Sequence, residues 1–422
     1  MNIGIGEKKR EKYTIYPMKT FMYFFGIIST MPLLQIFGMT FQLISSLLFV
    51  VFIGIEIFVR GSIRINSQKD KVFFAFFLST IISVVINFLT MPEMWKNGEL
   101  VSYIQFSILI LYYFYYLKNN KISEVVNFVK GIYVSCIIQM IWGYMQYVLV
   151  YFNIDLNKLI FNGILGMVDL ETTQSYGQTI KVSGLCWNSG NMAPILVIGL
   201  VLSRNVVLKI LFVLLALISN SRTALIGVVV CLGIQLFYEA FLRKKMKQIL
   251  VICAGIVVIL SLIVTNSSIL NMITKQAQSA FGAILNTQRD VSANVHLRYL
   301  TSVFDVIKQN SLLHNLFGFG IDCSGYVFAT YYNQYSGLKW IVECDYINIL
   351  WNYGVVGFFL YYSWYIKNVV KGFRINFKYI IIFCGLLIEG FFYNVTFNWN
   401  LMFIMSLFIL INRNIDIFEE ER

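Results

Sequence analysis

Charged residues are scarce in this chain. Only 13% of its 422 residues are Asp, Glu, Lys or Arg, whereas 58% are hydrophobic. A water-soluble protein of this size needs more charged surface than that. Apolar runs of about 15–22 residues recur from end to end, and a helix of roughly that length crosses a bilayer. The sequence therefore predicts an all-α, polytopic integral membrane protein and excludes a soluble enzyme.

Several residue types and motifs that carry common chemistries are also missing. The chain has four Pro, two His (His296 and His314) and seven scattered Cys without a C-x-x-C motif. We therefore predict no metal site and no cofactor, and most cysteines should be small core residues; a disulfide between Cys323 and Cys344 is the alternative. No Walker A motif, DxD triad, S4-like arginine series or potassium-filter sequence occurs, and no internal repeat suggests a two-half transporter.

Twelve membrane helices are predicted within a single integral membrane domain, residues 1–422. Their approximate ranges are 20–37, 40–59, 72–90, 100–117, 131–152, 188–203, 206–219, 223–241, 249–266, 345–366, 378–394 and 398–412. With both termini in the cytoplasm, most of the 33 Lys and Arg residues fall in inner segments, as the positive-inside rule requires. The net charge of +12 is then explained by flanks beside anionic lipid, and nucleic-acid binding is not predicted.

This orientation depends on residues 188–219 forming a hairpin of two short helices. The alternative is one tilted helix through Ser203-Arg204-Asn205, which would reverse every later segment. The basic clusters at 243–247 and 367–378 would then face outward. The hairpin keeps both clusters inside, and we therefore prefer it.

One arginine interrupts an otherwise apolar region. Arg222 stands in the sequence LISNSRTALIG, residues 217–227, at the predicted outer end of a helix. A guanidinium stays charged and is costly to place in hydrocarbon. The simplest interpretation is that its side chain extends to the lipid headgroups.

The longest hydrophilic stretch, residues 267–344, is predicted to be a large, partly helical external loop. Its segment 294–310 has helical periodicity, and we expect an amphipathic helix on the membrane or on the bundle. The predicted apolar stripe consists of Leu297, Leu300, Phe304 and Ile307. The polar candidates in this loop are Arg289, His296 and Arg298. Gly318, Gly320 and Gly325 should force turns, and their G-x-G follows no strand, which argues against a dinucleotide site.

Three carboxylates and an amide-rich segment complete the candidate residues. Glu343 and Asp345 stand where the chain re-enters the membrane, although a carboxylate at that position is often only a helix cap. Glu389 lies inside a predicted membrane helix and is a functional candidate for that reason. The outer loop 153–187 leads into Trp187, Asn188 and Asn191; amides beside an aromatic ring suit sugar binding, or equally a capped helix start.

In this order, the segments resemble the O-antigen polymerase and ligase superfamily, which includes Wzy-type polymerases and WaaL-type ligases. The resemblance covers about residues 182–360 and rests on SGLCWNSGNMA, SRTALIG, HLRYLTSVFDVI with LFGFG, and DYINILWNYGVVGF. Many ligases have a His-Asn pair where this chain has Asp345, with Asn348 three residues later. This departure favours a polymerase of O-antigen or capsule repeat units, and a ligase with another acceptor is the alternative.

The resemblance implies a GT-C-like glycosyltransferase of the bacterial cytoplasmic membrane with an outward-facing site. Its implied donor is an oligosaccharide on undecaprenyl diphosphate, whose diphosphate is already a good leaving group. We expect Arg222, Arg298 and Arg289 to hold this diphosphate without a metal, and Asp345, or next Glu343 or Glu389, to act as base. Trp187, Asn188, Asn191 and His296 are expected substrate contacts. A single displacement would invert the anomeric centre.

Other classes of protein are kept as alternatives. A lipid-oligosaccharide flippase would need cations along several helices, yet the predicted mid-membrane positions are nearly uncharged. A small-solute permease is the third candidate. The expected partners are the carrier-linked glycan, the bilayer and a chain-length regulator.

Overall fold

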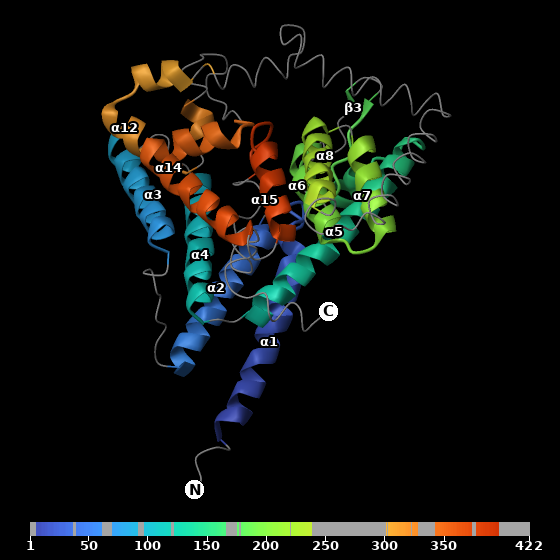
Figure 1. Ribbon diagram of the computed structural model, residues 1–422, viewed down its shortest axis with the longest axis horizontal. Helices are drawn as coiled ribbons and strands as arrows, with labels where there is room; N and C mark the ends of the chain where they lie inside the picture. The colour runs from blue at the N-terminus through green and yellow to red at the C-terminus, as the bar shows by residue number, and fades with distance from the viewer. Residues whose placement is uncertain are drawn as a thin grey trace.

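The computed structural model is mostly helical (Figure 1). It describes residues 6–36, 39–60, 70–91, 97–119, 122–165, 175–176, 179–219, 221–238, 301, 303–321, 323–327, 342–373 and 377–395. The helices are α1 Gly6–Ser29, α2 Phe41–Arg60, α3 Lys71–Thr90, α4 Asn97–Asn119, α5 Ile122–Val150, α6 Ser189–Leu202, α7 Val206–Ile218, α8 Arg222–Phe237, α12 Leu312–Phe317, α14 Asp345–Phe373 and α15 Phe377–Glu389. Every predicted helix that falls within these residues has a helical counterpart.

Two short antiparallel ribbons and a π-helix depart from the all-α prediction. They are β1 Gln35–Ile36 with β2 Met39–Thr40, β3 Ser175–Tyr176 with β4 Thr179–Ile180, and η3 Lys158–Ile164. Strands of two residues and a single π-helical turn are too short to produce a periodic pattern in a sequence. Residues 158–164 and 175–180 lie in the predicted outer loop 153–187. Gln35–Ile36 was predicted as the end of the helix 20–37, and this is wrong because α1 ends at Ser29.

Among the described residues, two helical segments are long and apolar enough to cross a membrane, 71–90 and 123–150. Shorter apolar helices lie at 43–55, 106–116, 189–202, 206–218 and 222–237. The helices predicted at 249–266 and 398–412 lie outside the described residues. A helical protein with membrane-spanning capacity is therefore supported, and the number of twelve spans stays a prediction.

The hairpin predicted for residues 188–219 is confirmed. α6 and α7 pack against each other and are joined by three residues, so the single tilted helix is wrong. Asn205 begins α7, where its Oδ1 accepts a hydrogen bond of 2.8 Å from the Val207 N–H. As a result α6 and α8 begin at the same end of the bundle, called the upper end here because Figure 1 draws it uppermost.

Helix α14 is bent where the glycine-rich loop after α12 packs against it. Gly354 has a φ of 66°, and the kink frees the carbonyls of Trp351 and Asn352 from helical hydrogen bonding. These carbonyls accept N–H groups from Phe319 at 2.9 Å and Gly320 at 2.8 Å. The backbone at 318–320 thus lies in close contact with the kink of α14. This contact explains why glycine occurs on both segments, at Gly318 and at Gly354.

The predicted apolar stripe of segment 294–310 can be checked at two positions, and there it faces away from the helix bundle. Phe304 and Ile307 are exposed, whereas Val303 and Val306 pack against a buried cluster that includes Trp351. Residues 294–300 lie outside the described residues. Cys323 and Cys344 belong to the same cluster as buried thiols, so the alternative of a disulfide between them is wrong.

A buried carboxylate organises the core at the lower end. Asp70 accepts hydrogen bonds from the Tyr113 hydroxyl at 2.6 Å and the Trp364 indole at 2.9 Å, and it also caps α3. Three donors offset the cost of burying the charge. This network ties α3, α4 and α14 together far from the upper end.

Candidate functional site

Four helix ends converge at the upper end of the bundle. α6 packs against α8 and α15, and α8 also packs against α15. The Asp345 N–H at the start of α14 donates to the Gly390 carbonyl just after α15, at 2.8 Å. Motifs that are more than 150 residues apart in the sequence, SGLCWNSGN and the DYINILWNYG that begins at Asp345, therefore flank the same region.

Buried amides fix the segment that leads into α6. Gln139 Oε1 accepts from the Leu185 N–H at 2.6 Å, and Gln146 Oε1 accepts from the Gly184 N–H at 2.7 Å. Asn157 Nδ2 donates to the Gly184 carbonyl at 2.9 Å. A buried loop needs such partners for its backbone, and here they come from α5 and the residues just before η3. The loop is consequently rigid at the point where it presents Trp187 and Asn188.

Arg222 is the first residue of α8 and is half-buried. Ser221 caps the helix by accepting from the Ala224 N–H at 3.3 Å, and Ser219, three residues before Arg222, accepts the Val182 N–H through its carbonyl at 3.3 Å. The SRTAL and VSGLC motifs are therefore adjacent. A helix N-terminus also favours anions, so the backbone of α8 and the guanidinium act in the same direction.

Asn188 links α6 to the end of α15. Its Oδ1 caps α6 by accepting from the Asn191 N–H at 2.8 Å, and its Nδ2 donates to the Tyr393 hydroxyl at 2.7 Å. Gly190 leaves room for the Tyr393 ring, since a Cβ there would lie 2.7 Å from ring atoms. Asn188 is thus a cap, as one interpretation expected, and it also holds a tyrosine. Trp187 beside it is 39% exposed.

Glu343 lies near two residues that the sequence did not single out. Burial raises the pKa of its carboxyl, and Lys181 opposes this shift by favouring the charged form. Glu343 is also close enough to Tyr393 to interact with it electrostatically. Neither Lys181 nor Tyr393 stands in a motif, and the chain contains 26 tyrosines, so only the fold identifies them.

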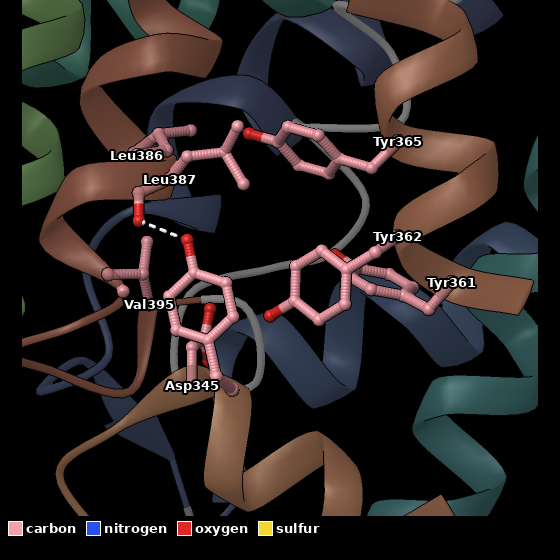
Figure 2. Close-up of a pocket in the computed structure, with 9 residues that line it drawn as sticks. Asp345, Tyr361, Tyr362, Tyr365, Leu386, Leu387 and Val395 are labelled. Carbon is pink, nitrogen blue, oxygen red and sulfur yellow. Dashed lines mark hydrogen bonds between the residues drawn. The ribbon is translucent and has the colours of Figure 1, made fainter. Parts of the chain in front are cut away.

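Asp345 is buried and lines a small pocket between α14 and α15 (Figure 2). The lining residues are Asp345, Tyr346, Tyr361, Tyr362, Tyr365, Leu386, Leu387, Gly390 and Val395. The Tyr346 hydroxyl donates to the Leu387 carbonyl at 2.7 Å, and Figure 2 shows the Tyr362 hydroxyl directed toward the side of the pocket that Asp345 occupies. A carboxylate among phenol groups can accept a proton or a hydrogen bond from a bound hydroxyl.

Glu389 ends α15 and is fully buried. Its carboxylate fits into the space left by Gly227 on α8, and neither oxygen has a hydrogen-bond partner among the described residues. The side-chain oxygens of Asn191 and Asn394 are likewise buried without a donor in that part of the chain. Several buried acceptors thus gather at this end of the bundle.

Three of the candidate residues cannot be placed. Arg289, His296 and Arg298 lie outside the described residues, and their part in the site stays a prediction. Within the part of the chain that the structure describes, no group of three His, Cys, Asp or Glu side chains is positioned to hold a metal ion. The fold brings together Arg222, Asn188, Glu343, Asp345 and Glu389 at one end of the bundle.

Comparison with known proteins gives one family. Residues 207–362 match the family described as O-antigen ligase. The match runs from α7 into α14, so it includes Arg222, Glu343 and Asp345 but neither Asn188 nor Glu389. No curated protein matches the chain.

Proposed function

Because residues 207–362 place this chain in the O-antigen polymerase and ligase superfamily, we propose that it polymerises lipid-linked oligosaccharide repeat units into a surface polysaccharide. The family supports a glycosyltransferase-like role in polysaccharide assembly. The finer assignment is that the donor is an oligosaccharide on undecaprenyl diphosphate and that transfer occurs at the outer leaflet.

The observation that carries the proposal is that a cation and carboxylates lie at the same end of the bundle. Arg222 stands at the N-terminus of α8, and Glu343 and Asp345 stand at the start of α14. Arginine binds two phosphate oxygens at once and keeps its charge where the dielectric constant is low. A carboxylate of suitable pKa can take a proton from an acceptor hydroxyl. The site thus has the groups that transfer from a lipid diphosphate requires.

The proposed reaction is a single displacement at the anomeric carbon of the donor sugar. The acceptor hydroxyl oxygen forms a bond to this carbon while the bond from the carbon to the diphosphate oxygen breaks. Asp345 receives the hydroxyl proton, and Arg222, with Arg298 and Arg289, stabilises the charge that develops on the leaving undecaprenyl diphosphate. Attack from the face opposite the leaving group inverts the anomeric configuration.

A ligase is the second candidate, because the matching family is described by that activity. The two enzymes would share the donor site and differ in the acceptor. Asp345 replaces the histidine of many ligases, and Asn348 is engaged elsewhere: its Oδ1 accepts from Ser324 Oγ and from Asn352 Nδ2 beside the kink of α14. These features favour the polymerase.

The glycan of a deletion strain tests this assignment. Loss of a polymerase should leave single repeat units on the carrier or on the final anchor, and the full chain expressed in trans should restore long polymer. Long polymer that remains on the carrier and never reaches its anchor would identify a ligase instead. Repeat units retained on the cytoplasmic side would identify a flippase and overturn the proposal.

A further inference from the structure

The segment after α5 carries apolar side chains on two opposite faces. Leu156 and Phe161 point inward and are buried, and Phe161 packs with Met31, Leu33 and Leu185. The other face is exposed, with Phe152 and Ile164 each at 70%. We call this exposed face the η3 patch; it consists of Tyr151, Phe152, Leu159, Ile164 and Leu165.

The segment around α12 repeats this arrangement. Val303 and Val306 pack inward, as described above, and the outward side chains are again apolar. Phe304 is 70% exposed and Leu312 is 73% exposed. This second exposed face, the α12 patch, consists of Phe304, Ile307, Leu312 and Leu313.

Each patch adjoins the end of one of the two helices that, among the described residues, are long and apolar enough to cross a membrane. The η3 patch starts at Tyr151, directly after α5 ends at Val150. The α12 patch adjoins the end of α3, where Thr90 Oγ1 is hydrogen-bonded to His314 Nε2 at 3.0 Å. Both helices also have exposed apolar faces, namely Val85, Phe88 and Leu89 on α3 and Ile141, Met145 and Val148 on α5. The apolar surface of each helix therefore continues into a patch.

We propose that the two patches lie in the headgroup region of one leaflet and fix the depth of the protein in the bilayer. Isolated apolar residues on a surface need no explanation, but clusters that extend an apolar helix face do. Figure 1 places α12 and the end of α5 on opposite sides of the upper end. A planar bilayer touches both sides at once, whereas one protein partner or a second copy would cover a single side.

Each patch has a lysine beside it. Lys158 precedes Leu159 and Lys308 follows Ile307, and both lysines are exposed; Asp305, next to Phe304, is exposed as well. A lysine stem can lie along apolar surface while its ammonium reaches anionic headgroups. Tyrosine side chains such as that of Tyr151 are also common at this depth. Each patch thus combines apolar side chains with a cation in the manner of an interfacial element.

The inferred depth bears on the candidate site. Arg222, Asn188 and Asp345 lie at the same upper end as the patches, so the bilayer would place them at headgroup level. The diphosphate of a lipid carrier occupies that level, and this link to the carrier rests on the proposed function. The inferred depth of the patches is independent of the proposed function.

Fluorescence quenching in proteoliposomes tests the inference. Single cysteines replace Leu312, Ile164, Gln309 or Ile82 in the full chain lacking its native cysteines and carry a polarity-sensitive fluorophore. The vesicles contain phosphatidylethanolamine and phosphatidylglycerol, with spin labels placed shallow or deep in the acyl chain. Gln309 is the exposed polar control, and Ile82, midway along α3, is the deep control.

We expect Leu312→Cys and Ile164→Cys to be quenched more by the shallow than by the deep label. Their quenching by aqueous iodide should be several-fold weaker than at Gln309→Cys. Iodide quenching equal to that at Gln309→Cys would show that the patches face water and would overturn the inference. Protection from both iodide and lipid labels would show a protein cover, such as a second copy, and would overturn it equally. Lipid-buried patches in a protein that fails to polymerise glycans would refute the proposed function alone.

Discussion

At the scale of single residues, the candidate site holds three carboxylates in different surroundings. Glu343 lies beside Lys181, Asp345 faces a pocket of tyrosines, and Glu389 is buried against α8. Only a group that a substrate hydroxyl can reach will serve as the base. Asp345 lines the pocket that Figure 2 shows, and we therefore expect it to be the base.

Replacing Asp345 with Asn should abolish most turnover while the donor still binds. The substitution keeps the shape and removes the proton acceptor, and general-base catalysis contributes about 10²–10⁴-fold. The measurement is the initial rate of glycan extension, beside the matched variants Glu343→Gln and Glu389→Gln. A near-normal rate for Asp345→Asn together with an inactive Glu389→Gln would place the base on α15. If Asp345 only caps α14, the change should be confined to stability, by about 1 kcal/mol or less.

Arg222→Lys should be severely impaired although the positive charge remains. An ammonium cannot bind two phosphate oxygens in the plane that a guanidinium offers. The matched control is Arg204→Lys in the exposed connection between α6 and α7, at the lower end. Polymer length is compared on whole cells at equal protein levels. Normal length for Arg222→Lys would exclude bidentate phosphate binding at this position.

Tyr393→Phe should weaken use of the substrate more than it weakens the fold. The variant loses the hydrogen bond that Asn188 Nδ2 donates, which contributes about 0.5–1.5 kcal/mol to stability. Tyr147→Phe, which removes a 2.8 Å hydroxyl contact with Tyr151 on the exposed part of α5, is the control. We expect KM for the glycan to rise only in Tyr393→Phe. An equal effect of both variants on KM would show that Tyr393 has no part in the site.

At the scale of helices and loops, the sequence predicted the elements that depend on long apolar runs. It did not predict features that depend on tertiary contacts. The helix ranges and the hairpin at 188–219 follow from apolar runs and from the basic clusters. The inward face of residues 303–309 could not be predicted, because Val303, Phe304, Val306 and Ile307 are all apolar. Only tertiary packing determines that the two valines point inward. Tyr393 and Lys181 join the site through a fold that brings together residues more than 160 positions apart.

The kink of α14 depends on glycine. A Cβ at Gly354 would strike the backbone of residues 316–317, and its φ of 66° is unfavourable for other residues. Gly354→Ala should therefore lower the free energy of unfolding in detergent by about 1–3 kcal/mol, the usual cost of such backbone strain. Gly54→Ala in α2 has open space and should leave stability equal or slightly higher. Equal stability of Gly354→Ala and the unchanged protein would contradict this packing.

At the scale of the whole molecule, every placed candidate residue lies at the upper end, and the network around Asp70 lies at the lower end. The predicted orientation then requires the upper end to face outward. Which end faces the cytoplasm follows from the distribution of basic residues and is a prediction that chemical labelling can check.

Single cysteines test this orientation in whole cells. In a background without native cysteines, Gln309→Cys at the upper end should react with a membrane-impermeant thiol reagent. Arg204→Cys at the lower end should react only after the cells are permeabilised. Labelling in the reverse pattern would place the candidate site in the cytoplasm, where an outer-leaflet polymerisation could not occur.

Turnover by the purified protein is the most direct test of glycan polymerisation from a lipid diphosphate. The full chain in liposomes is supplied with the lipid-linked repeat unit alone, without ATP, nucleotide sugar or added metal, and the products are separated by size. We expect a ladder of glycans that differ by one repeat unit, released undecaprenyl diphosphate in equal measure, and no ladder with Asp345→Asn. Unchanged repeat units with the active, folded protein, or a ladder of equal rate from Asp345→Asn and Arg222→Lys together, would contradict the proposed chemistry.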